Sequence, residues 1–327
     1  MAGANTHRFD SDGVLLFGGL SHPDLADEIV DYLGIERSPS SVTRFSNDNF
    51  EVQLGVSVRK KDVFILQTLV APVSDNLLEL LMMLDIARTS GARSVHAIVP
   101  YYSYARSDKK DAPRISVAGR LIADLMIESG AQHIITMTLH SPQVHGFFNI
   151  HTDHLTAHSV FVDYFKQQDL SNCVVVSPDI GNAKRASKLA RSLNVPLAIA
   201  EKKRLSDRSV EVTSILGEVR GKRVLLTDDE IATGGTILTV QGILKDHGAG
   251  PVTIVSTHGL FTGQAAARFD AVDDIDEIVV TDTVPLPPEH RPERLTVLSV
   301  GHIFGEVIRR TIMGESVGEL FEFWPDT

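Results

Sequence analysis

Short apolar runs alternate with longer amphipathic segments along almost the whole chain. Runs rich in Val, Ile and Leu, such as 95–99, have the length of buried strands. Between them, apolar residues recur at helical spacing, as across 23–33. This alternation predicts an α/β fold of mainly parallel sheets flanked by helices. We expect strands at 14–17, 42–45, 50–54, 63–67, 95–99, 134–139, 174–176, 197–200, 210–215, 224–226, 252–256, 277–281 and 295–300, and helices at 23–33, up to 88, 116–128, 183–193, from 237, and 303–312.

This pattern occurs twice. KDVFILQTL, starting at Lys61, and KRVLLTDDE, starting at Lys222, both continue through a loop, a helix, a Gly-Ala turn and a strand. The turn comes 30 residues after Lys61 and 26 residues after Lys222. We therefore predict two tandem duplicated domains, 1–156 and 157–302, with 303–327 packing back on the first domain. Generic similarity between two βαβ units is the alternative.

The second copy contains the strongest chemical signal, RVLLTDDEIATGGTILT. Asp228, Asp229 and Glu230 follow its apolar run, and Thr-Gly-Gly-Thr (233–236) precedes a helix that starts near Ile237. Glycines allow backbone N–H groups to approach an anion, and a helix N-terminus adds partial positive charge. The two aspartates suit sugar hydroxyls, or a magnesium ion held partly through water. The stretch predicts a sugar-phosphate site, with an ordinary strand-to-helix turn as the alternative.

Six histidines lie between His133 and His158. Their density suggests zinc, but the segment has no cysteine partner and no HExxH pattern, so a structural zinc site is not expected. We interpret most of these histidines as polar loop residues. His140 is singled out because it follows an apolar run, and α/β proteins place their sites at the carboxyl ends of parallel strands.

Two basic segments stand out in a chain with a net charge of −11. The first interleaves tyrosines with Arg106, Lys109 and other cations, which makes it a candidate polyphosphate contact, with a solvated charged loop as the alternative. The second, 201–208, is expected to be a polar, mobile loop.

Composition narrows the partners and the compartment. With 42 acidic against 31 basic residues, nucleic acid and anionic membranes are not expected as main partners. The lone Cys173 excludes an intrachain disulfide and fits a reducing compartment. The start of the chain lacks a signal-peptide core, and no run reaches the roughly 18 apolar residues of a membrane span. We expect a cytoplasmic location.

Seven stretches, in their order along the chain, resemble the ribose-phosphate pyrophosphokinase family over nearly the whole length. They are VFILQTLVAPVSDNLLELLMMLD, IVPYYSYARSDKK, IITMTLHSPQVHGFF, VVVSPDIGNAKRASKLA, LAIAEKKR, VLLTDDEIATGGTI and VVTDTVPLP. Ordinary phosphoribosyltransferases share only the Asp-Asp and Thr-Gly-Gly-Thr element. The resemblance implies two tandem type I phosphoribosyltransferase-like domains, with ATP on the first and ribose 5-phosphate on the second.

The resemblance also implies a reaction and roles for single residues. The β,γ-diphosphoryl group of ATP would move to the 1-hydroxyl of ribose 5-phosphate, in an enzyme that self-associates as a dimer-based hexamer. ATP would contact Phe45, Asn47, Asn49, Arg106, Ser107 and Lys109; ribose 5-phosphate would contact Asp228, Asp229, Ala232, Thr233, Gly234, Gly235 and Thr236; Lys202 and Arg204 would be catalytic; and His140 and Asp179 would hold magnesium.

The chain departs from the family pattern at five of its positions, Asn47, Asn49, Ser107, Asn182 and Ala232. The family has acids where the two asparagines of the Phe-Ser-Asn-Asp-Asn segment stand, which puts the preference for ATP in question. These departures keep open a non-catalytic regulatory homologue that binds an active synthetase, with a phosphoribosyltransferase as a further alternative. Retention of charged residues such as His140 and Asp179 argues against the regulatory homologue.

Overall fold

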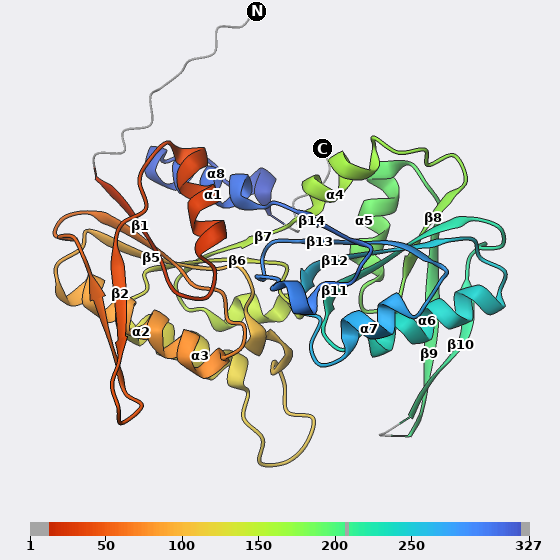
Figure 1. The fold of residues 1–327 in the computed structure, drawn as a ribbon, viewed down its shortest axis with the longest axis horizontal. Coiled ribbons are helices and arrows are strands. Elements are labelled where there is room, and N and C mark those ends of the chain that lie inside the picture. Colours follow the sequence, from red (N-terminus) through yellow and green to blue (C-terminus); the bar gives the residue numbers. More distant parts are fainter. Residues whose placement is uncertain (1–12, 207–208, 322–327) are drawn as a thin grey trace, which may run out of the picture. The chain divides into compact units, whose positions relative to one another are not determined.

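Figure 1 shows the fold of the chain as a computed structural model. The structure describes residues 13–206 and 209–321, and the side chains of these residues outside 202–213. The chain divides into two compact units. The first runs up to Thr156 and resumes at Val300, and the second is Ala157–Ser299. Each unit is built around its own sheet.

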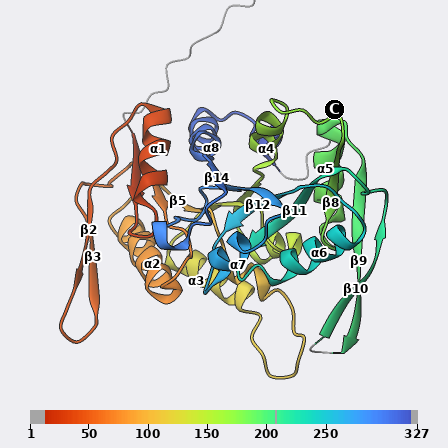
Figure 2. The same ribbon diagram turned by 45° about the vertical axis from the view of Figure 1, so that its right-hand side comes forward.

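The first unit has a five-stranded sheet in the order β1-β4-β5-β6-β7, and every neighbouring pair is parallel. A separate antiparallel hairpin, β2–β3, extends from this unit (Figure 2). The elements are β1 (Val14–Gly18), α1 (Pro23–Leu33), β2 (Ser40–Arg44), β3 (Phe50–Leu54), β4 (Asp62–Leu66), α2 (Val73–Thr89), β5 (Ser94–Val99), α3 (Ala118–Ser129), β6 (His133–Met137), β7 (His151–Leu155) and α8 (Gly301–Met313).

The second unit has a seven-stranded sheet in the order β10-β9-β8-β11-β12-β13-β14. All neighbouring pairs are parallel except β9–β10, an antiparallel hairpin at one edge. The elements are α4 (His158–Phe165), β8 (Cys173–Ser177), α5 (Ala183–Leu193), β9 (Leu197–Ser206), β10 (Ser209–Leu216), β11 (Arg223–Ile231), α6 (Gly235–Asp246), β12 (Val252–Gly259), α7 (Ala265–Asp270), β13 (Ile275–Thr281) and β14 (Leu295–Leu298).

The two units repeat one order of elements: strand, helix, hairpin, strand, helix, strand, helix and two final strands. The repeat seen in the sequence at Lys61 and Lys222 coincides with β4 and β11, and each of these strands lies inside its sheet. The predicted α/β fold with tandem duplicated, mainly parallel sheets is confirmed.

Local sequence explains why these elements form. All five residues of β4 are buried, because a strand inside a parallel sheet is covered on both faces. On α5, Ala186, Leu189, Ala190 and Leu193 recur at helical spacing and are all buried. Each such leucine contributes on the order of 1.5–3 kcal/mol when it is removed from water. A separate apolar core forms in each unit.

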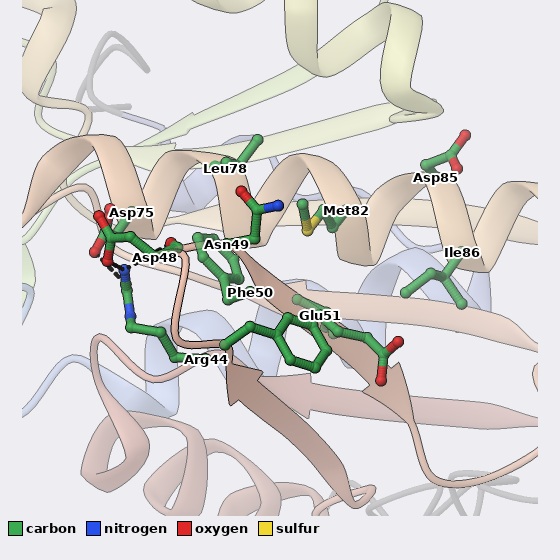
Figure 3. Close-up of a pocket in the computed structure, with 12 residues that line it drawn as sticks. Arg44, Asp48, Asn49, Phe50, Glu51, Asp75, Leu78, Met82, Asp85 and Ile86 are labelled. Carbon is green, nitrogen blue, oxygen red and sulfur yellow. Dashed lines mark hydrogen bonds and ion pairs between the residues drawn. The ribbon is translucent and has the colours of Figure 1, made fainter.

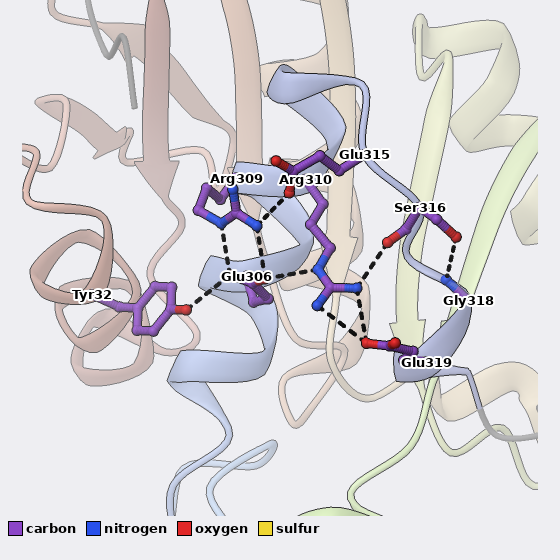
Figure 4. A network of polar contacts seen from close by, with 8 residues as sticks. All are labelled: Tyr32, Glu306, Arg309, Arg310, Glu315, Ser316, Gly318 and Glu319. Atoms are coloured by element: carbon purple, nitrogen blue, oxygen red, sulfur yellow. Dashed lines mark hydrogen bonds and ion pairs between the residues drawn. The ribbon is translucent and has the colours of Figure 1, made fainter. Parts of the chain in front are cut away.

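Helix α8 packs on α1 within the first unit, and a charged network joins them (Figure 4). Glu306 accepts hydrogen bonds from Tyr32 Oη at 2.9 Å, Arg309 Nε at 2.9 Å and Arg310 Nε at 2.7 Å. These donors, Arg309 first, lower the pKa of Glu306 to about 2. Arg310 also donates to the carbonyl of Ser316 at 2.8 Å, which ties down the segment after the helix.

Several local expectations were wrong. Residues 201–206 continue β9 and pair with β10, so the expected loop is a hairpin up to Ser206, and 207–208 lie outside the described residues. Most of the clustered histidines are not loop residues, because β7 and α4 were missed. The short helix α7 was also missed. No helix among the described residues is long and apolar enough to cross a membrane.

Candidate active site

The acidic residues of the second unit lie on a strand rather than after one. β11 runs on to Ile231 between β8 and β12, so Asp228, Asp229 and Glu230 are part of the sheet. Asp229 and Glu230 are each only 7% exposed, whereas Asp228 is half-buried. The carboxylates therefore lie at the carboxyl end of a central strand, where a parallel sheet offers its ligand sites.

This acidic group is electrostatically crowded. Burial raises the pKa of Asp228 well above its ordinary value, and the neighbouring charges of Asp229 and Asp179 raise it further. Asp228 Oδ1 accepts the backbone N–H of Asp229 at 2.9 Å, which fixes its orientation. A group of this kind favours partners that donate hydrogen bonds or carry positive charge.

The glycine loop after β11 opens α6. Gly234 is the N-cap residue with φ of 74°, and a Cβ at this position would lie 2.6 Å from Phe269 Cζ. Only glycine fits both the backbone and the space. The helix start has no side-chain cap, so its N-terminal dipole faces the loop. Arg268, which sequence reasoning missed, donates to the carbonyl of Thr233 at 2.8 Å and holds the loop.

The remaining predicted sugar-phosphate residues lie along the same loop. Thr233 and Thr236 are exposed, and Ala232 and Gly235 are partly buried. The N–H of Thr262 donates to the carbonyl of Ala232 at 3.0 Å, which ties the loop to the end of β12. The structure brings this whole predicted group together in one place.

A second loop of this unit follows β8 and carries Asp179 and Asn182. The N–H of Asn182 donates to Asp179 Oδ1 at 3.0 Å, and its Nδ2 donates to the carbonyl of Thr227 at 2.9 Å. Asn182 thus links this loop to β11 just before the acidic pair. Its Oδ1 is buried without a hydrogen-bond partner among the described residues. The departure noted at Asn182 is a structural bridge that the sequence did not reveal.

The basic stretch of the first unit follows β5. Arg106 ends a 3₁₀ turn, Ser103–Arg106, and is exposed, as is Lys109, whose Nζ lies 3.8 Å from Asp111 Oδ1. Ser107 has a structural role: its Oγ accepts the N–H of Ala118 at 3.1 Å, at the start of α3.

The expectation that Ser116 caps α3 was wrong. Val117 is the N-cap residue, and it provides no side-chain cap. Ser107 Oγ instead donates to the carbonyl of Ser116 at 3.1 Å. His140 is exposed, beyond the carboxyl end of β6. It lies in the first unit and Asp179 in the second, so each is placed within its own unit.

The β2–β3 hairpin borders a hollow of about 710 Å³ beside α2 (Figure 3). Phe45 and Asn49 line it, and Phe45 is 48% exposed. Asn47 Oδ1 accepts the N–H of Asn49 at 3.4 Å within the turn. Arg44 bridges Asp48 at 2.7 Å and Asp75 at 2.5 Å, which fixes the turn against α2. The lining includes four carboxylates and one arginine, so it suits an amino-bearing base better than phosphates.

The predicted catalytic pair lies on the β9–β10 hairpin. Lys202 is the register partner of Val212, and Arg204 that of Val210. Their side chains lie outside the described residues, so their role stays a prediction.

The fold and the β11–α6 loop define an α/β protein of the phosphoribosyltransferase type, duplicated in tandem. Residues 14–130 match the family model for the N-terminal domain of ribose phosphate pyrophosphokinase, and 205–322 match a phosphoribosyl synthetase-associated domain. A ribose-phosphate pyrophosphokinase of Deinococcus radiodurans is 45% identical over 313 residues, which cover 94% of this chain and 98% of the relative. One from Wolinella succinogenes is 44% identical over 309 residues, covering 94% and 99%.

A solved structure gives the same result. The crystal structure of phosphoribosylpyrophosphate synthetase from Mycobacterium smegmatis superposes with a TM-score of 0.87 and 37% identity, over 92% of this chain and 99% of that one. The chain belongs to the ribose-phosphate pyrophosphokinase family.

Proposed function

We propose that this chain transfers the β,γ-diphosphoryl group of ATP to the 1-hydroxyl of ribose 5-phosphate, giving phosphoribosyl pyrophosphate and AMP. The observation that carries the proposal is the β11–α6 loop, where a crowded acidic pair adjoins a helix N-terminus with no side-chain cap. A sugar phosphate offers hydroxyl donors to the acids and an anion to the helix. Membership of the family supports the reaction type.

In this proposal the second unit holds ribose 5-phosphate. Asp228 and Asp229 accept hydrogen bonds from the ribose hydroxyls. The 5-phosphate binds the backbone N–H groups and hydroxyls of 233–236, beside Ala232. The strained glycine at 234 is needed because an added Cβ would meet Phe269 and change the path of the loop.

The first unit supplies the contacts to ATP. The exposed Phe45 ring stacks on adenine, and the acid-lined hollow accepts its amino group through Asn49 and neighbours. Asn47 shapes the turn. Arg106 and Lys109 meet the phosphates, and Ser107 fixes the turn that presents Arg106.

The oxygen donors fit magnesium. Acids crowded enough to raise the pKa of Asp228 favour a nearby cation, and Asp179 and Asp228 supply the hard oxygen ligands that magnesium prefers. Asp179 would hold the ion together with His140. When bound, magnesium neutralises charge on the phosphate oxygens. Asn182 holds Asp179 in position through its N–H.

The step itself needs positioning and charge neutralisation more than covalent help. The ribose 1-oxygen attacks the β-phosphorus and loses its proton. The bond from that phosphorus to the bridging oxygen of the α-phosphate breaks, and AMP leaves with that oxygen. Lys202 and Arg204 meet the charge on the moving group.

The test is AMP formation from ATP and magnesium, measured with and without ribose 5-phosphate. AMP that appears only with the sugar phosphate is the expected result. AMP without the sugar would indicate ATP hydrolysis and contradict the proposal. Absence of AMP with ATP, GTP and CTP would favour the regulatory homologue, and the next step would then be a search for a partner synthetase.

We also propose a cytoplasmic enzyme that self-associates as a dimer-based hexamer. Family membership and an acidic net charge support these two statements. Sedimentation of the purified chain with ATP and magnesium would show the assembly size, and a monomer at all concentrations would contradict it.

A further inference from the structure

A row of histidines crosses the first unit's sheet at its amino edge. His96, His133 and His151 are register partners on β5, β6 and β7, and His133 and His151 are the first residues of their strands. His140 lies beyond the other end of β6, a strand of five residues or roughly 17 Å. The row is therefore separate from the ligand loops at the carboxyl edge.

A buried carboxyl group lies among these rings. Asp153 on β7 is 0% exposed, and its Oδ2 lies 3.1 Å from His133 Nε2. Its Oδ1 lies 3.4 Å from His151 Nε2 and makes no hydrogen bond among the described residues. A buried carboxylate with one oxygen left unbonded is costly unless a cation satisfies it.

The proton positions next to this group can be worked out from one end. Asp62 is paired with Arg93, whose hydrogen bonds hold the pKa of Asp62 below its ordinary value. Ser94 has a single hydroxyl proton, and it donates to Asp62 Oδ1 at 2.6 Å. The 2.7 Å contact between Ser94 Oγ and His96 Nε2 must then be donated by the imidazole.

His96 is neutral, because burial and the neighbouring His133 lower its pKa to about 3. With its proton on Nε2, its Nδ1 is an acceptor, and the 3.0 Å contact to His133 Nδ1 is donated by His133. In a neutral His133 the Nε2 atom therefore carries a lone pair. Two acceptors, His133 Nε2 and Asp153 Oδ2, then face each other at 3.1 Å and require a positive charge between them.

We propose that His133, His151 and Asp153 bind a divalent transition-metal ion of the zinc class. The three donor atoms lie within 4.8 Å of one another. Zinc takes imidazole nitrogen and carboxylate oxygen at about 2.0–2.2 Å, and the chain of bonds through His96 and Ser94 is the outer support that such histidine ligands need.

Access and geometry agree with this assignment. The His151 side chain is 64% exposed, so an ion can enter from solvent at this edge and keep water as its fourth ligand. The His133 and His151 rings stack with centroids 4.2 Å apart and planes 13° apart. A ligand lone pair lies in the plane of its ring, so His151 must turn out of the stack on binding. Its exposure leaves room for that rotation.

The test uses Co²⁺ as a spectroscopic probe on the full chain, stripped of metal and without substrates. We expect visible d–d bands at one equivalent, bleached by Zn²⁺ and unaffected by excess Mg²⁺, because magnesium avoids nitrogen ligands. In His151→Gln the bands should be lost. His302→Gln, which changes another exposed histidine of the same unit, should keep them.

Thermal unfolding supplies a second readout. Zn²⁺ should raise the Tm of the wild type and of His302→Gln and leave that of His151→Gln unchanged. His151 is exposed, so its replacement should leave the fold intact, unlike that of buried Asp153. If Co²⁺ gives no bands, or the same bands in His151→Gln, the group holds a proton instead, as a His133 imidazolium paired with Asp153, and the proposal is wrong.

Discussion

The loops after β4 and β11 are copies of one design with opposite uses. Six residues into the repeat the first unit has Gln67 and the second has Asp228. Gln67 is fully buried: its Oε1 accepts from Ser21 Oγ at 2.6 Å, and its Nε2 donates to Glu79 Oε2 at 2.7 Å. A Cβ on Gly19 would lie 2.3 Å from Gln67 Oε1, so the side chain fills the space after β1 as well.

The second loop has no such filling. Asp228 lies beside other acids, and α6 begins at a glycine pair, whereas α2 begins after Pro72. In the first unit Asn76 Nδ2 bonds the carbonyl of Val70 at 2.8 Å and closes the loop on itself. The difference shows that a duplicated strand–loop–helix becomes a ligand site when its polar groups are left for a partner to satisfy.

Asp228→Asn is the change expected to break the comparison most. We expect kcat/KM for ribose 5-phosphate to fall by at least about 10²-fold, because a positioning contact is lost. The fold should not weaken. The pKa of Asp228 is raised by folding, so ionisation of this carboxyl destabilises the native state as pH rises through that pKa. The variant's Tm should therefore exceed that of the wild type by more at about pH 8 than at about pH 5. Near-normal turnover, or a lower Tm at both values, would contradict this.

Gln67→Glu tests the closed loop. It places a second carboxyl against Glu79, whose pKa is already raised by burial, and we expect a loss of about 2–4 kcal/mol in unfolding free energy near neutral pH. The loss should shrink on acidification, because a shared proton removes the repulsion. Urea unfolding at several pH values measures it. The double variant Gln67→Glu, Glu79→Gln restores one donor and one acceptor and should recover most of the stability; equal loss in both variants would rule out this interpretation.

Gly234→Ala against Gly242→Ala tests the glycine at the start of α6. The first meets Phe269 and a positive φ, so we expect a loss of about 1–3 kcal/mol and a raised KM for ribose 5-phosphate. Gly242, within the same helix, has no heavy atom within 4 Å of an added Cβ, and alanine there should stabilise by about 0.5–1 kcal/mol with KM unchanged. Equal effects of the two substitutions would count against the phosphate cradle.

Glu306→Gln probes the first unit alone and should have the smallest effect. Because the network is partly solvated, we expect a loss of about 1 kcal/mol at neutral pH. Folding lowers the pKa of Glu306 to about 2, so its contribution is present above its unfolded value and is lost as pH falls toward 2. The Tm difference from the wild type should close over that acid range. Glu36→Gln, an exposed glutamate of the same unit, should show no such difference.

Local patterns were enough to predict the fold and half of the site. Alternating apolar runs and the repeat identified the sheets, and the contiguous 228–236 stretch identified the loop. Groups assembled across strands were not visible. Ser107 supports α3 from 11 residues away, and His96 meets His133 across 37 residues through parallel register. No spacing rule in one sequence reveals such register, because it is set by packing of the whole sheet.

The contact between Tyr32 and Glu306 joins residues 274 apart, and the entire second unit lies between them in the chain. During synthesis the second unit emerges complete while the first still lacks α8. The domain that begins translation first is therefore the last to close, and it must keep the α8-facing side of α1 uncovered until the ribosome has made the final helix. A stalled or shortened chain would leave a finished second domain tethered to an unfinished first one.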